Sequence, residues 1–148
     1  MNIVQVTNWQ QLKQLVSLAQ EYSEEHKQYD ASFAVYAVEL VRRWQLPTHE
    51  FHLLYDELEP IGYTILHIDE TGLNNTLYIY DLFITKEHRG KKGFYTLIKD
   101  VYETAKKYNL KRGEFASELD VETWKHLTQL PVKEKRIIVV DNTEYKET

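Results

Sequence analysis

The sequence contains no cysteine. This absence excludes disulfide bonds, zinc sites built on cysteine and a thiol nucleophile. The sequence also has no apolar run approaching the roughly 18 residues that indicate a membrane-spanning helix. The first residues, Met1–Gln5, show neither a basic segment nor a long apolar run of the kind found in secretory signals. We therefore expect a cytoplasmic protein that has no membrane partner.

An excess of positive charge is also absent. The formal net charge is −5 at pH 7, which opposes binding to nucleic acids because phosphate backbones require a basic face. The negative charge is compatible with a cationic substrate such as an amine or a polyamine. We expect no nucleic-acid partner.

A metal-binding pattern is missing from the six histidines. His49 and His52 are three residues apart, but we expect them at a strand entrance and not on one helical face. His67 and His88 lack a close partner in the sequence. The sequence therefore predicts no metal site.

No internal repeat, low-complexity stretch or linker divides the 148 residues. Hydrophobic residues make up 43% of the chain and charged residues 28%, as in an ordinary globular protein. We predict a single domain over residues 1–148, with residues 142–148 as a solvated tail.

The first fifty residues predict one strand and two helices. Ile3–Val6 has the apolar character of a short strand, and Asn8 with Gln11 resembles a capping box at a helix start. Apolar residues at helical spacing follow up to Tyr22. A second helix, capped by Asp30 or Ser32, carries apolar residues from Phe33 to Trp44 on one face.

The helical period then ends, and the sequence indicates three strands over Phe51–Tyr55, Ile61–Ile68 and Leu77–Thr85. The turn residues of Asp69–Asn75 predict a hairpin between the last two. A basic turn, Arg89–Gly93, leads into a helix whose inner face is formed by Phe94, Leu97, Ile98, Val101, Ala105 and Tyr108.

The remaining residues predict a weak strand over Gly113–Glu118, a short helix over Asp120–Leu130 stopped by Pro131, and a strand over Arg136–Val140. The predicted order is β-α-α-β-β-β-α-β-α-β. It indicates an α/β (α+β) fold with a mixed sheet and helices on both faces. The turn at Arg89–Gly93 aims free backbone N–H groups and the positive end of a helix dipole at one point, which suits a phosphate or pyrophosphate.

The segment Tyr80–Lys91, with the sequence YDLFITKEHRGK, resembles the core motif of the Gcn5-related N-acetyltransferases (GNAT). It is most similar to the diamine acetyltransferase-like version of that motif. The resemblance implies the GNAT acyl-CoA N-acyltransferase fold, with acetyl-CoA as cosubstrate and a small-molecule or peptide amine as partner. It also implies that the amine attacks the thioester carbonyl directly, with a strand N–H holding the oxyanion.

The resemblance also assigns a cosubstrate site. The backbone of Leu82, Phe83 and Ile84 would hydrogen-bond the pantetheine arm. The backbone N–H groups of the following turn would hold the pyrophosphate, and this turn consists of Arg89, Gly90, Lys91, Lys92, Gly93 and Phe94. In an ungapped alignment, Lys92 and Phe94 stand where the family motif has its two diagnostic glycines. A one-residue insertion would instead place Gly93 at the first glycine and Tyr95 at the second. Lys91 and Lys92 could add charge to the pyrophosphate.

The catalytic positions of the family are altered as well. Tyr80 occupies the position of a family glutamate, and Asp81 is its neighbour. A tyrosine hydroxyl is a poor base near neutral pH, whereas Asp81 would face the other side of a regular strand unless a β-bulge turned it inward. Leu127 aligns with the family's proton-donating tyrosine, and Asp120 aligns with a family asparagine.

Two functions therefore stay open. One is acetyl transfer to a primary amine, with Asp81 or Tyr80 near the amine. The other is a diverged binding or interaction module that has little or no transferase activity. The sequence leaves open the identity of the acceptor, and whether the chain forms a homodimer. Acidic residues at 21, 24, 25 and 30 form either a solvated helix end or part of a site for a cationic acceptor.

Overall fold

The computed structural model describes residues 1–26, 33–71, 75–117 and 120–135. The chain divides into two compact units, Met1–Ala116 and Ser117–Thr148. The single domain expected over residues 1–148 stays a prediction. No helix in the described part of the chain is long and apolar enough to cross a membrane.

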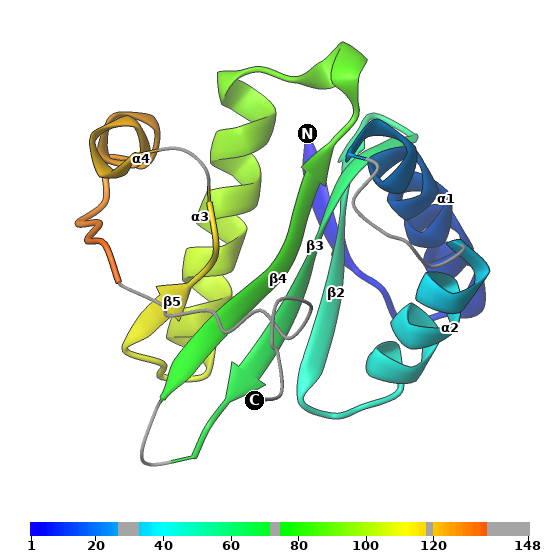
Figure 1. Ribbon diagram of the computed structural model, residues 1–148, viewed down its shortest axis with the longest axis horizontal. Coiled ribbons are helices and arrows are strands. Elements are labelled where there is room, and N and C mark those ends of the chain that lie inside the picture. Colours follow the sequence, from blue (N-terminus) through cyan, green and yellow to red (C-terminus); the bar gives the residue numbers. More distant parts are fainter. Residues whose placement is uncertain (27–32, 72–74, 118–119, 136–148) are drawn as a thin grey trace, which may run out of the picture. The chain divides into compact units, whose positions relative to one another are not determined.

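The first unit is built on a mixed sheet whose strands lie in sequence order (Figure 1). The first four strands pair antiparallel, and the fourth pairs parallel with the fifth. The strands are β1 (Asn2–Gln5), β2 (His49–Asp56), β3 (Glu59–Asp69), β4 (Thr76–Ile84) and β5 (Arg112–Glu114). This arrangement confirms the mixed sheet expected from the sequence.

Helices cover both faces of the sheet (Figure 1). Helices α1 (Trp9–His26) and α2 (Phe33–Trp44) lie on one face, and α3 (Lys91–Lys107) lies on the other. The capping prediction at the start of α1 is confirmed, since Asn8 Oδ1 accepts the Gln11 N–H at 2.9 Å. The Gln11 side chain reaches back to the Thr7 N–H at 2.8 Å. The predicted cap of α2 at Asp30 or Ser32 lies outside the described residues.

Two apolar layers hold these helices on the sheet. Under α1 and α2, the fully buried side chains include Leu15, Leu40 and Tyr63. Under α3, Leu97 packs on Leu54 and the neighbouring strands. The predicted inner face of α3 is confirmed, because all six of its residues belong to the layers under this helix or are buried.

Two predicted boundaries are wrong. The strand expected at Gly113–Glu118 is β5 and covers only Arg112–Glu114. Helix α3 already begins at Lys91 with Gly90 as its N-cap, so the basic turn is partly helical. A glycine cap offers no side-chain signal in the sequence, which explains the second error.

The second unit contains helix α4 (Val121–Thr128). Asp120 caps this helix by accepting the Thr123 N–H at 2.7 Å. Gln129 adopts a left-handed conformation at its end, with φ 56°. The predicted strand Arg136–Val140 and the predicted tail lie outside the described residues.

Candidate active site

Strand β4 has an open edge along its second half. Strand β5 pairs only with Thr76, Leu77 and Tyr78. Among the described residues, no strand pairs with the same edge of β4 from Ile79 to Ile84. The two strands therefore leave a stretch of backbone available to an extended ligand.

The hydrogen-bond pattern indicates which residues face this open edge. The Thr85 N–H donates to the Ile61 carbonyl of the β3 side at 2.8 Å. Because antiparallel ladders alternate, Phe83 also points its backbone groups toward β3, whereas Leu82 and Ile84 point theirs to the open edge. The Ile84 carbonyl already accepts the Arg89 Nε–H at 2.9 Å. The backbone N–H and carbonyl of Leu82 and the backbone N–H of Ile84 can therefore bind a ligand.

A pocket of about 430 Å³ lies beside this edge. Six of the nine residues that the sequence assigned to the cosubstrate site line it. The lining residues are Tyr22, Glu25, Leu82, Phe83, Ile84, Arg89, Gly90 and Phe94. The structure thus brings the end of β4, the following turn and the end of α1 together around one space.

The three other assigned residues form the first turn of α3. Lys91, Lys92 and Gly93 follow the cap Gly90, which has no side chain to satisfy their N–H groups. No acidic residue lies in this turn, and the Lys92 side chain is exposed. Free N–H groups and the helix dipole favour an anion at this point.

Gly93 lets the start of α3 lie close to the sheet. A Cβ atom at Gly93 would lie 3.3 Å from Ile84 Cδ1 and 3.7 Å from the His88 carbonyl oxygen. The first distance is tighter than ordinary van der Waals contact, so a side chain here would force the end of the Ile84 side chain to shift. Gly93 thus serves packing between helix and strand.

The Arg89 side chain lies along the pocket wall. Its Nη2 atom is 2.6 Å from Glu25 Oε2 of α1, and its guanidinium lies 5.7 Å from the Phe83 ring centroid. The hydrogen bond to Glu25 raises the pKa of Arg89 further. Arg89 therefore connects α1 with the turn after β4, a role that the sequence did not indicate.

Other carboxylates lie near the Arg89–Glu25 ion pair. Burial, followed by the charges of Glu87 and Glu25, raises the pKa of Glu21. Of the predicted acidic cluster, Glu25 lines the pocket, while Asp30 lies outside the described residues. The α1 side of the pocket thus carries negative charge that Arg89 partly balances.

The two predicted catalytic residues lie at a bulge in β4. Ile65 of β3 pairs with Asp81 and Leu66 pairs with Ile79, so Tyr80 is an extra residue on β4. The bulge that the sequence analysis required for an inward Asp81 is therefore present. Tyr80 and Asp81 both contact α2, and they lie on the same face of the sheet.

Asp81 is a half-buried carboxylate that accepts a hydrogen bond from the Tyr36 hydroxyl of α2. Burial raises the pKa of Asp81 above its ordinary value, against the opposing effects of the Tyr36 hydrogen bond and the Arg43 charge. A carboxylate with a raised pKa is a better proton acceptor when ionised. Asp81 has the surroundings expected of a general base.

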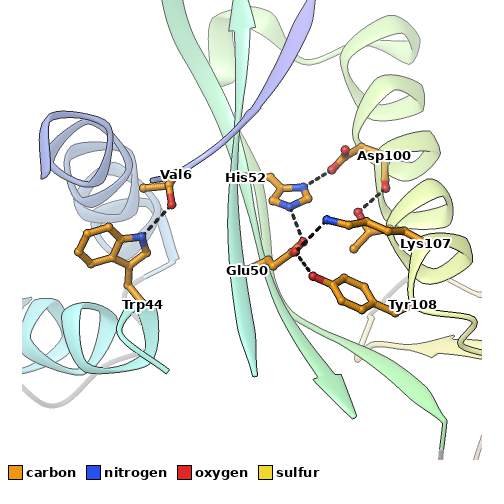
Figure 2. A network of polar contacts seen from close by, with 8 residues as sticks. Val6, Trp44, Glu50, His52, Asp100, Lys107 and Tyr108 are labelled. Carbon is orange, nitrogen blue, oxygen red and sulfur yellow. Dashed lines mark hydrogen bonds and ion pairs between the residues drawn. The ribbon is translucent and has the colours of Figure 1, made fainter. Parts of the chain in front are cut away.

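A second polar cluster lies between β2 and α3 (Figure 2). His52 bonds Asp100 of α3 at 2.5 Å and Glu50 at 3.0 Å. Glu50 also accepts a hydrogen bond from Tyr108 at 2.5 Å and lies 3.6 Å from Lys107 Nζ. We call these five residues the His52 network. They connect the middle of α3 and its end to strand β2.

The position expected for His52 is wrong, because this residue is buried within β2 and not at a strand entrance. His67 and His88 also have partners that the sequence did not reveal. His67 stacks on His49, and His88 bonds the Thr85 hydroxyl at 2.9 Å. In the described part of the chain, no three or more His, Asp or Glu side chains are arranged so that they could hold a metal ion.

Comparisons with known proteins agree with this fold. A family model described as "Acetyltransferase (GNAT) family" matches residues 9–124. An aminoglycoside antibiotic 6'-N-acetyltransferase from Acinetobacter haemolyticus is 17% identical, with 96% of this chain and 99% of that chain covered and a TM-score of 0.72. A ribosomal-protein-alanine N-acetyltransferase from Brucella melitensis is 12% identical, with coverage of 95% and 100% and a TM-score of 0.67. No curated protein sequence matches the chain.

Proposed function

The chain belongs to the acetyltransferase (GNAT) family, and from this membership we propose that it transfers an acetyl group from acetyl-CoA to a primary amine. The open edge of β4 beside the pocket carries the proposal. Family membership supports acetyl transfer in general, while the cosubstrate and the acceptor are our inference. The diamine acetyltransferase-like variant stays a prediction.

The pocket fits the chemistry of acetyl-CoA. The pantetheine arm carries two amides, and Leu82 and Ile84 present backbone donors and an acceptor on the open edge. The pyrophosphate needs donors and positive charge, which the first turn of α3 offers through free N–H groups and Lys92. Phe94 lines the space between these two parts.

In the proposed reaction, the thioester supplies an activated acetyl group and the acceptor amine attacks its carbonyl carbon. Asp81 accepts the proton that the amine must lose to become a nucleophile. The Leu82 N–H donates to the oxygen on which negative charge develops. The new C–N bond forms as the C–S bond breaks, and the thiolate leaves with the bonding electron pair. A covalent enzyme intermediate through a thiol is excluded, since the chain has no cysteine.

A second candidate is a binding module that keeps the fold without turnover. Lys92, Phe94 and Leu127 stand at positions where the family motif has two glycines and a proton-donating tyrosine. Phe94 in addition fills part of the pocket wall. These substitutions favour weak or absent chemistry, but not loss of the pocket.

Thermal stability in the presence of acetyl-CoA tests the proposal, followed by thiol release with a panel of primary amines. We expect the melting temperature to rise with acetyl-CoA concentration and free thiol to appear with at least one amine. No thermal shift at millimolar acetyl-CoA would refute the proposed acetyl transfer. A shift without thiol release from any amine would support the binding module.

A further inference from the structure

Planar side chains form a row across three strands, on the face of the sheet that α2 covers. His49, His67 and Tyr78 are direct neighbours across β2, β3 and β4. His49 and His67 stack with ring centroids 4.7 Å apart and an angle of 7° between their planes. His67 and Tyr78 lie 5.6 Å apart. Tyr80 joins them at 5.7 Å from His67, and we call these four residues the ring cluster.

The β4 bulge connects the ring cluster to the proposed base. Because Tyr80 is the extra residue, it and Asp81 follow each other on the same face. Tyr80 is 47% exposed, so its ring is accessible. A ligand whose amine reaches Asp81 would therefore extend over Tyr80.

Arg43 of α2 lies over this ring, with its guanidinium carbon 5.0 Å from the Tyr80 centroid. Stacking on a ring holds a guanidinium flat and leaves its N–H donors at the edge. Its neighbour Arg42 forms an ion pair with Glu39 at 3.0 Å. Within the described ranges, no carboxylate lies at ion-pair distance from Arg43.

The surroundings make Arg43 the fixed positive charge of this surface. Burial, followed by the charges of His67 and Arg43, lowers the pKa of His49, so His49 is uncharged near neutral pH. The charge of Arg43 also acts on Asp81, which already accepts the Tyr36 hydrogen bond. A positive and a negative group thus lie close enough on this face of the sheet for the charge of one to act on the other.

We propose that the acceptor is an amine that also carries a carboxylate, with its amine at Asp81 and its carboxylate on the guanidinium of Arg43. The proposal rests on the proposed function and names its substrate class. A planar guanidinium binds a carboxylate through two parallel N–H donors. A diamine or polyamine would instead bring a second positive charge to Arg43, which like-charge repulsion disfavours. The positive charge of Arg43 therefore disfavours acceptors that carry a second amine next to it.

Matched pairs of acceptors test the proposal, because each pair differs only in the carboxylate. Suitable pairs are lysine with cadaverine and phenylalanine with phenethylamine. NMR signals of the His49 and His67 rings report binding to the ring cluster directly, with coenzyme A present and without any need for turnover. Rates of acetylation are measured on the same pairs.

We expect the carboxylated member of at least one pair to shift the His67 ring signals, with a Kd at least about tenfold lower than that of its partner. Arg43→Gln should abolish this difference, and Arg43→Lys should keep only part of it because lysine has no planar fork. Arg42→Gln is the matched control and should leave it unchanged, since this neighbour pairs with Glu39 on the exposed surface.

Equal or tighter binding of the decarboxylated members would overturn the proposal, as would an unchanged difference in Arg43→Gln. The absence of ring shifts with all four compounds at tens of millimolar would also overturn it. Melting temperatures of the variants establish that each is folded. A failed acetyl-CoA thermal shift, by contrast, would refute the proposed function itself, so the two failures are distinguishable.

Discussion

The His52 network gives the prediction with the best-defined magnitude. Burial alone would lower the pKa of His52, but the hydrogen bonds that its ring donates to Asp100 and Glu50 raise it from 6.5 to about 9. Burial alone would raise the pKa of Glu50, but hydrogen bonds from His52 and Tyr108 lower it to about 2. His52 is therefore a charged imidazolium between two carboxylates at neutral pH.

The rise of the His52 pKa from 6.5 to about 9 corresponds to about 3 kcal/mol, at about 1.4 kcal/mol for each pKa unit. The shift of Glu50 describes part of the same interaction and is not added. Breaking a buried ion pair by removing one partner costs about 3–5 kcal/mol in other proteins. We therefore expect Glu50→Gln to lower the free energy of unfolding at pH 7 by about 3 kcal/mol.

Urea denaturation followed by circular dichroism measures this loss. Lys107→Gln is the matched control, because the Lys107 side chain is 61% exposed and its Nζ lies 3.6 Å from the same carboxylate. An exposed pair of this kind contributes at most about 1 kcal/mol. Equal losses in the two variants, or a loss below about 1 kcal/mol in Glu50→Gln, would refute the reasoning.

The pH dependence follows from the signs of the same two shifts. A raised histidine pKa adds stability that is complete below pH 6.5 and is lost as the pH rises through about 9. A lowered carboxyl pKa adds stability that is complete above pH 4.5 and is lost as the pH falls toward about 2. The wild-type contribution is thus largest between these two ordinary values. In Glu50→Gln the folded-state pKa of His52 should be lower, so the alkaline loss should be smaller and should be complete at a lower pH than in the wild type.

Three further predictions concern the site and its support. Asp81→Asn should lower kcat/KM by about 10²–10⁴ and remove the acidic limb of the pH–rate profile, since the raised pKa of Asp81 places its deprotonation above pH 3.8. In urea denaturation, Gly62→Ala should lower the free energy of unfolding by about 1–3 kcal/mol, because its Cβ would lie 2.6 Å from the Phe83 carbonyl oxygen. Gly113→Ala is the control, since its Cβ would lie 3.7 Å from the nearest atom, and it should change this free energy by about 0.5 kcal/mol or less. Arg89→Lys should raise the Kd of acetyl-CoA about tenfold in calorimetric titrations, because lysine cannot donate to the end of β4 and to α1 at the same time.

The sequence predicted the elements whose apolar period is regular. The stripe from Leu12 to Tyr22 follows from burying one face of α1, and the short apolar runs of β2 and β3 follow from burying both faces of these strands. The bulge at Tyr80 was considered only as the condition under which Asp81 could turn inward, because Asp81 would face the opposite side of a regular strand. These features can be predicted because each depends on residues that are close together in the sequence.

The features that the sequence did not reveal depend on residues far apart along the chain. His52 and Asp100 are 48 positions apart, and Arg89 and Glu25 are 64 positions apart. A pattern of neighbouring residues therefore cannot indicate either pair. One signal for the His52 network was present, since Glu50 and His52 alternate with apolar residues in one strand and must share a face. The partner on α3 could be found only from the fold.

The central claim is that the open edge of β4 and the first turn of α3 bind acetyl-CoA, and amide NMR during a coenzyme A titration tests it most directly. We predict that the largest shifts fall on the N–H groups of Leu82, Ile84, Lys92 and Gly93, and that the amides of the His52 network shift less. Saturable shifts that map elsewhere, or no shifts at millimolar coenzyme A, would contradict the account.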